Sequence, residues 1–227
     1  MLRILSVIGA LCGVLLSASD AQLIGLPPAP RLTPAGRALI FDGETGGERV
    51  YNRSPHPEYP GGASGVTWGI GYDAHQNSAD TIRDDWRQLG APIAQRLSLS
   101  QPYFGQAARA YLPKVRDITV PWAIATDVFL RIDLSRVDAQ CRRAFPSFAR
   151  YRPTAQDAVR SLVFNRGPSM AGPARVEMRA LRDCLERGDY EGAAQQEIAM
   201  IRLWVGRDIY NGMRNRRMAE AQLFRTP

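Results

Sequence analysis

The chain has 227 residues, which is typical of one domain and long enough to bury a substantial core. Hydrophobic residues make up 45% and charged residues 22%, as is ordinary for a soluble globular protein rather than a disordered one. The net charge is +7, and Lys114 is the only lysine, so arginine supplies nearly all the positive charge. Such a charge favours a polyanionic partner, which could be nucleic acid, an anionic membrane or a cell wall.

The first residues have the layout of a secretory signal peptide. A short basic start at Met1–Arg3 precedes the apolar run Ile4–Leu16, and Ser19 and Ala21 place small residues just before Gln22. The run is too short for a comfortable membrane span. We therefore expect residues 1–21 to be a signal peptide and the protein to be exported, periplasmic or extracellular, without stable membrane insertion. A buried N-terminal helix and an uncleaved segment that tethers the chain to the membrane are the alternatives.

Three cysteines are present, at positions 12, 141 and 184. If Cys12 leaves with the signal peptide, Cys141 and Cys184 form an even pair in an oxidising compartment. The sequence therefore predicts one possible disulfide, between two helical segments. Two free buried thiols are the alternative.

The segments after the signal peptide suggest a linker, a short helix and then a small β-rich lobe. Residues 22–32 are proline-rich and read as an extended linker. Thr33 caps a predicted helix over residues 35–41, with a proline in its first turn. The stretch from Glu48 to Asp73 is rich in Gly, Pro, Ser and Tyr, and its alternating end, Val66–Tyr72, predicts a short strand.

From Thr81 almost to the end, apolar residues recur three and four apart, which is the helical period. Glycine and proline residues separate the predicted helices. These span residues 81–89, 101–116, 121–145, 155–164, 176–187, 190–200 and 215–223. The expected fold class is α+β and mainly helical, with a small β-rich lobe and a larger helical lobe.

Two acids and a threonine form the candidate site. Glu44 follows an apolar helical segment and is flanked by glycines, Asp73 directly follows the predicted strand, and Thr67 lies on that strand. Hydrolysis of a glycosidic bond needs one carboxyl group that protonates the leaving oxygen and a second that activates water or attacks the sugar. Each residue alone is weak support, because a Glu near a helix end is usually solvated and an Asp after a strand is usually a turn or cap residue.

Three sequence blocks strengthen the support for these roles, because together they resemble the lysozyme-like muramidases of phage and bacteriocin type. After Glu44 and a glycine-rich loop comes GVTWGIGYD, which is similar to the family's Thr-x-Gly-x-Gly block. The helix ending SLVFNRG and the closing segment GMRNRRMAEAQLF are similar to two further family blocks. The blocks lie, in order, at residues 65–73, 161–167 and 212–224.

The resemblance implies one lysozyme-like catalytic domain over residues 33–227 that cuts peptidoglycan between N-acetylmuramic acid and N-acetylglucosamine. Glu44 would be the general acid, and Thr67 would help Asp73 to position water. Common phage lysozymes carry the second acid in a short loop before the threonine, whereas the longer insert and the Gly-Tyr-Asp ending here resemble the pesticin-like branch, which favours Asp73. Glu48 and Glu58 remain alternative second carboxylates.

Other residues belong to the predicted site with less specific support. Asn165 matches a polar position beside the cleft in the family, although it is equally explained as a helix end satisfied by backbone. Trp68 and Tyr72 are predicted to stack on sugars, and core packing explains them as well.

Several other classes fit the sequence less well. A cysteine peptidase needs a reactive Cys with a His partner, and zinc hydrolysis needs ligand spacings that this chain lacks, so we expect no cofactor and no metal. Export disfavours nucleic acid as a partner. A lytic transglycosylase of the same fold, which works with one Glu, and a non-catalytic wall-binding protein remain open. We expect a monomer whose partner is peptidoglycan.

Overall fold

Helix α1 (Pro34–Thr45) begins at the predicted cap, because the Gly36 amide donates a hydrogen bond of 3.0 Å to Thr33 Oγ1. It runs past its predicted end at Phe41. The computed structural model describes residues 29–227, without the side chains of residues 42–45. The predicted signal peptide, Cys12 and residues 22–28 of the predicted linker lie outside the described residues.

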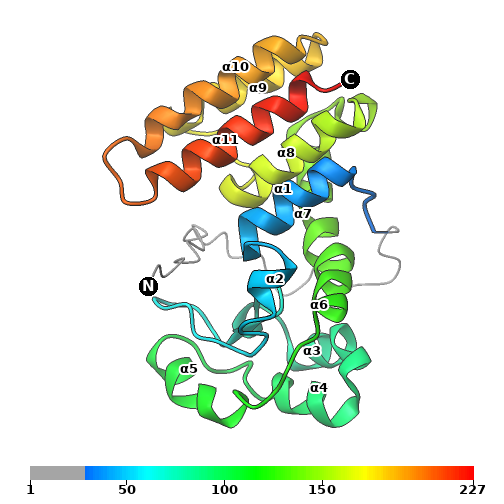
Figure 1. The fold of residues 1–227 in the computed structure, drawn as a ribbon, viewed down its shortest axis with the longest axis vertical. Helices are drawn as coiled ribbons and strands as arrows, with labels where there is room; N and C mark the ends of the chain where they lie inside the picture. The colour runs from blue at the N-terminus through cyan, green and yellow to red at the C-terminus, as the bar shows by residue number, and fades with distance from the viewer. Residues whose placement is uncertain (1–28) are drawn as a thin grey trace. The chain divides into compact units, whose positions relative to one another are not determined.

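The described chain divides into two compact units, each drawn in Figure 1. The hairpin unit comprises residues 44–133, and the helical unit comprises residues 29–43 together with residues 134–227. Helices dominate both units, and the described residues hold a single two-stranded sheet. The predicted mainly helical α+β class is therefore confirmed.

The hairpin unit holds the small sheet and five of the labelled helices, joined by short 3-10 and π-helical turns. Strands β1 (Thr67–Trp68) and β2 (Tyr72–Asp73) are antiparallel. The predicted single strand over residues 66–72 is therefore a hairpin, because the chain reverses at the glycines between the strands. The remaining elements are α2 (Glu48–Tyr51), η1 (Ala74–Gln76), α3 (Ala79–Asp85), η2 (Arg87–Leu89), α4 (Ala91–Ser98), α5 (Gln106–Tyr111), η3 (Leu112–Lys114), α6 (Trp122–Val128) and the π-helical η4 (Phe129–Asp133).

The helical unit is a bundle in which α10 packs on both α9 and α11, and α11 also packs on α8 (Figure 1). Its core is built from apolar side chains of these helices, among them Leu162, Leu181 and Phe224, which are all fully buried. The elements are α7 (Leu134–Ala144), η5 (Phe148–Arg150), α8 (Pro153–Arg166), η6 (Pro173–Arg175), α9 (Val176–Glu186), α10 (Tyr190–Ala199), η7 (Met200–Trp204) and α11 (Tyr210–Arg225).

The start of α1 is anchored on α8 by one buried carboxylate. Asp157 Oδ2 accepts hydrogen bonds of 2.8 Å from both the amide and the hydroxyl of Thr33. The other oxygen pairs with Arg160 Nη1 at 2.8 Å, so the carboxylate is compensated although it is fully buried. Gly36 is required at this contact, because a Cβ atom there would lie 2.1 Å from Asp157 Oδ2.

The predicted disulfide between Cys141 and Cys184 is wrong, because both cysteines are free and buried. The Cys141 thiol on α7 donates to the carbonyl of Val159 on α8 at 3.9 Å. The Cys184 thiol on α9 lies against α10, where a Cβ atom on Gly192 would be 2.9 Å away from it. Each thiol thus fills a different helix–helix contact, and burial raises the pKa of both.

The predicted helices agree with the structure best in the helical unit, where α8 to α11 correspond to four of them. In the hairpin unit the prediction over residues 101–116 begins too early, since α5 starts at Gln106, and α4 was not predicted. The prediction over residues 121–145 corresponds to α6, a π-helical segment and α7. No helix within the described part of the chain is long and apolar enough to span a membrane.

Candidate functional site

A tight hairpin turn carries the central residues of the predicted site. Thr67 pairs with Asp73 and Trp68 with Tyr72, so that three residues connect the strands. Gly69 and Gly71 flank the turn with φ angles of 61° and 76°, which side-chain-bearing residues rarely adopt.

Thr67 lies at the centre of a short cross-strand row. On one side it pairs with Asp73, and on the other its amide and carbonyl bond to the carbonyl and amide of Glu58 at 2.9 and 2.7 Å. Directly opposed residues of antiparallel strands project to the same face. We call Glu58, Thr67 and Asp73 the carboxylate–threonine row. Since neighbouring strands lie about 4.8 Å apart, the backbones of its two acids are about 10 Å apart.

The carboxylate of Asp73 is held in place by two backbone amides. The Gly65 amide donates to both carboxylate oxygens at 3.1 Å, and the His75 amide donates to Oδ1 at 2.9 Å. The carbonyl of Asp73 also accepts from Asn77 Nδ2 at 2.9 Å. Asp73 therefore fixes the hairpin and caps η1. The contacts that hold its carboxylate come from backbone amides and not from a basic side chain.

The hydroxyl of Thr67 makes only one long contact. It donates to the carbonyl of Gly65 at 3.5 Å, whereas O–H···O bonds are normally 2.5–3.0 Å. The residue is nevertheless buried, with 3% of its surface exposed. The Thr67 hydroxyl is therefore only weakly hydrogen-bonded to the protein.

Glu58 differs from Asp73 in its surroundings. Its side chain as a whole is exposed, yet protein atoms packed around the carboxyl group raise its pKa above the ordinary value. The Tyr51 hydroxyl, which donates to the carbonyl of Val120 at 2.9 Å, also has a raised pKa, first through burial and then through the charge of Glu58. The row thus combines an acid that binds its proton more tightly with an acid held by backbone amides.

Trp68 and Tyr72 lie in the core of the hairpin unit, with 1% and 2% of their surfaces exposed. Their ring centroids are 5.6 Å apart, and both rings contact Trp86, at 6.0 and 5.3 Å. The Tyr72 hydroxyl donates to Asp85 Oδ2 at 2.7 Å. In this position neither ring offers a face to a sugar. Of the two roles that the sequence allowed for Trp68 and Tyr72, the structure shows core packing. The aromatic cluster supports the hairpin from behind.

The remaining predicted acids lie near the start of the hairpin unit. Glu44 is in the last turn of α1, and its side chain lies outside the described residues. Glu48 is exposed in the first turn of α2. Of the two alternative second acids, only Glu58 is paired with Thr67.

Asn165 belongs to the helical unit, where it borders a buried ionic network. Its Oδ1 accepts from Arg217 Nη2 at 3.1 Å. Arg217 lies 2.8 Å from Glu197 and 2.9 Å from Glu220, and all three are fully buried. Burial raises the pKa of Glu197 well above its usual range. These contacts give Asn165 a structural partner of its own.

The pairing of Glu58 with Thr67 was not predicted, although the sequence holds a signal for it. Glu58 lies next to Tyr59, which precedes Pro60, and a residue that precedes proline favours extended backbone. An extended segment beside a predicted strand is a candidate pairing partner. The contribution of Trp86 to the aromatic cluster had no local signal, because its position reads as an ordinary apolar helix residue.

The row is suited to acid–base chemistry. It places two acidic residues on either side of a hydroxyl-bearing residue, and hydrolysis of a glycosidic bond uses a pair of carboxyl groups. Within the part of the chain that the structure describes, no group of three or more His, Cys, Asp or Glu residues could hold a metal ion.

Residues 38–132 match a family described as a domain of unknown function (DUF8812). The match covers most of the hairpin unit, including the whole carboxylate–threonine row, together with the second half of α1. No curated protein matches the chain significantly.

Proposed function

We propose that this protein is an exported, lysozyme-like glycoside hydrolase that cuts the glycan strands of peptidoglycan between N-acetylmuramic acid and N-acetylglucosamine. The observation that carries the proposal is the carboxylate–threonine row, in which Thr67 is paired with an acid on each side. The sequence resemblance to lysozyme-like muramidases adds Glu44, in the last turn of α1. The net charge of +7 suits an anionic wall.

In the proposed reaction Glu44 donates a proton to the glycosidic oxygen as the bond to the anomeric carbon breaks. Asp73 accepts a proton from a water molecule, whose oxygen forms the new bond to that carbon. Thr67 orients this water through its weakly engaged hydroxyl. The fixed position of the Asp73 carboxylate supports this role, because a general base must be within hydrogen-bond reach of the proton that it takes.

A lytic transglycosylase is the second candidate, because the same contacts of Asp73 are also compatible with a purely structural role for that residue. Because Gly65 and His75 occupy that carboxylate, Asp73 has a complete structural role without any chemistry. In that case a single glutamate acts alone and the product ends in an anhydro sugar. The raised pKa of Glu58 makes it the alternative to Glu44 as the proton donor.

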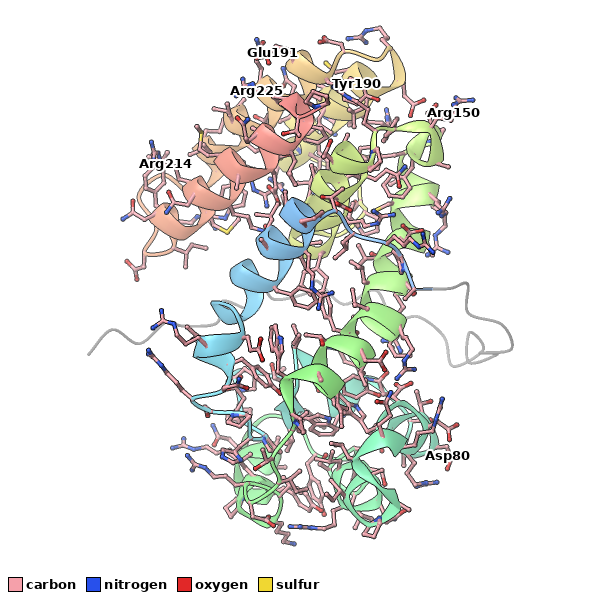
Figure 2. The ribbon with its side chains drawn as sticks, turned by 45° about the vertical axis from the view of Figure 1, so that its right-hand side comes forward. Asp80, Arg150, Tyr190, Glu191, Arg214 and Arg225 are labelled. Atoms are coloured by element: carbon pink, nitrogen blue, oxygen red, sulfur yellow. The ribbon has the colours of Figure 1, made fainter. Side chains whose placement is uncertain are left out.

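The test uses purified peptidoglycan, the full-length protein and mass spectrometry of the released fragments. Glu44→Gln, Glu58→Gln and Asp73→Asn are compared with Asp80→Asn, a control in the same unit. Asp80 lies on the surface of α3, where it is paired only with Arg83 (Figure 2). Loss of an exposed pair of this kind has little effect on stability.

We expect reducing-end fragments from the wild type and the control. Glu44→Gln and Asp73→Asn should each lower the rate about 100-fold or more, because a positioned acid or base contributes that much. Anhydro products with an active Asp73→Asn variant would replace the hydrolase by the transglycosylase. Wall clearing at the normal rate by Glu44→Gln would refute its assignment, and a loss confined to Glu58→Gln would move the acid to that residue.

A further inference from the structure

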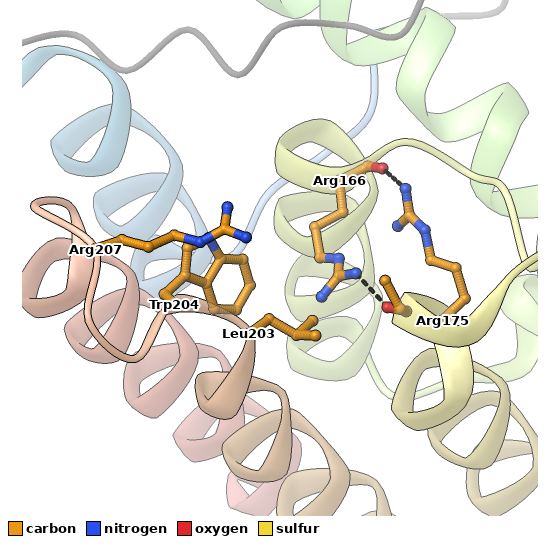
Figure 3. A pocket seen from close by; sticks show the side chains of 6 residues that line it. Arg166, Arg175, Leu203, Trp204 and Arg207 are labelled. Atoms are coloured by element: carbon orange, nitrogen blue, oxygen red, sulfur yellow. Dashed lines mark hydrogen bonds between the residues drawn. The ribbon is translucent and has the colours of Figure 1, made fainter.

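A cavity of about 370 Å³ opens in the helical unit. The carboxylate–threonine row belongs to the hairpin unit, so the cavity is a separate feature. Three arginines surround it: Arg166 at the end of α8, Arg175 at the end of η6, and Arg207 after η7 (Figure 3). Leu203 and Trp204 form its apolar side.

Two of the arginines are held at the cavity by reciprocal hydrogen bonds. Arg166 Nη2 donates to the carbonyl of Ala174 at 2.6 Å, and Arg175 Nη2 donates to the carbonyl of Arg166 (Figure 3). This clamp closes the loop over residues 167–174. Arg166 Nη1 remains buried without a hydrogen-bond partner. A buried guanidinium nitrogen without a partner is costly, so a bound acceptor would stabilise it.

The protein compensates the positive charge at the cavity only in part. None of the three arginines forms an ion pair with a described residue, and the Arg207 side chain makes no hydrogen bond to one. The nearby carboxylates are already engaged, since Glu177 pairs with Arg202 and Glu197 pairs with Arg217.

The surroundings of Arg166 disfavour its charged form. Burial, followed by the charges of Arg175 and Arg217, lowers its pKa to about 10, although Glu197 and Glu177 oppose the shift. A group whose charged form is disfavoured in this way gains from a nearby anion.

Trp204 gives the cavity a second kind of surface. Its ring system is contacted by two guanidinium groups, with the Cζ atoms of Arg166 and Arg217 at 5.3 and 5.6 Å from a ring centroid. Together with Leu203 it offers an apolar wall next to the three unpaired cations (Figure 3). A ligand that fits both surfaces has an anionic group attached to a carbon skeleton.

We propose that this cavity binds a phosphate ester, whose phosphate lies among Arg166, Arg175 and Arg207 and whose organic part lies against Trp204. Guanidinium groups donate charge-assisted hydrogen bonds to phosphate oxygens, and the fork of Arg207, which no described residue engages, can donate two in parallel. A phosphate monoester carries close to two negative charges, which offset several unpaired cations better than a single carboxylate does. The proposal does not depend on the hydrolase activity.

The experiment measures binding of phenyl phosphate and inorganic phosphate to the full-length protein by calorimetry at constant ionic strength. Arg207→Gln removes an exposed lining cation whose side chain makes no hydrogen bond or ion pair to a described residue, so its fold should be intact. Arg214→Gln is the matched control, because Arg214 projects from α11 into solvent (Figure 2). We expect phenyl phosphate to bind more tightly than inorganic phosphate, and Arg207→Gln to weaken binding about tenfold.

Three results would overturn the proposal. These are no binding by the wild type, equal weakening in Arg207→Gln and Arg214→Gln, and equally tight binding of acetate.

Vesicles of phosphatidylcholine with and without phosphatidate identify the source of the phosphate. Sedimentation that needs phosphatidate and Arg207 supports a lipid headgroup, whereas binding of phenyl phosphate alone supports a soluble ester. Unchanged phosphate binding in Glu44→Gln keeps this site independent of the proposed hydrolase.

Discussion

Gly65 is the position where one added methyl group should damage the candidate site most directly. A Cβ atom on Gly65 would lie 2.4 Å from Asp73 Oδ1, 2.8 Å from His75 Cβ and 2.9 Å from the His75 amide nitrogen. Two of these three contacts involve the turn at His75, which cannot rotate away as a flexible side chain would. Gly65→Ala must therefore displace the Asp73 carboxylate or move the start of η1.

The cost follows from the contacts that are lost. Displacing the carboxylate breaks its hydrogen bonds to the Gly65 and His75 amides, and a hydrogen bond to a charged group contributes about 1.5–3 kcal/mol. Water can replace part of this, since Asp73 is only half-buried, while overpacking adds about 1–3 kcal/mol. We expect a loss of about 2–4 kcal/mol in the free energy of unfolding, or roughly 5–15 °C in Tm for a chain of this size.

Urea unfolding followed by tryptophan fluorescence measures this loss, because Trp68 belongs to the hairpin and Trp86 packs against it. Gly212→Ala is the control, since an added Cβ at Gly212 in α11 meets no atom within 4 Å. That change should be neutral or stabilise the protein by about 0.5–1 kcal/mol. If Gly65→Ala unfolds at the wild-type urea concentration, the tight contact between Gly65 and Asp73 does not exist.

Three further predictions concern the helical unit. Gly36→Ala should destabilise the protein by about 2–4 kcal/mol in urea unfolding, because the added methyl group displaces the buried Asp157 carboxylate; wild-type stability would contradict the anchoring of α1. Burial alone would raise the pKa of Glu186, but hydrogen bonds from Ser147 and Tyr151 hold it below its ordinary value. Stability from this group is therefore present above the unfolded-state pKa of about 4.3 and is lost as the pH falls through the lower folded-state pKa, so Glu186→Gln should flatten the acid side of the stability curve. Cys141 and Cys184 should react with iodoacetamide only after unfolding, and peptide mass spectrometry that finds them joined would reinstate the disulfide.

The sequence predicted what depends on local period and on caps. The cap at Thr33 and helices α8 to α11 followed from residue types within a few positions of one another. The hairpin was read as one strand, because Trp68 and Tyr72 alternate with their neighbours as strand residues do. The two glycines between them carried the turn, and glycine is equally compatible with a strand passing close to another backbone.

What the sequence could not predict depends on contacts between distant residues. Cys141 and Cys184 look like a pair when only their number and compartment are considered, but each packs into a different helix contact. From the sequence alone, Trp68 and Tyr72 are candidates for stacking on sugars, but in the structure both rings are buried against the ring of Trp86. The choice between a binding and a packing role was decided by tertiary neighbours, which periodicity does not describe.

The structural and the proposed chemical roles of Asp73 are compatible, and the geometry allows them to be separated. The carboxylate is oriented by amides of the same hairpin that carries Thr67, so its position is fixed by backbone rather than by a second side chain. Asparagine keeps an Oδ1 oxygen that can accept from both amides, so Asp73→Asn should retain the hairpin and lose only the ability to take a proton. If Asp73→Asn keeps wild-type stability but loses activity, Asp73 takes part in the reaction. If stability and activity fall together, its contribution is structural.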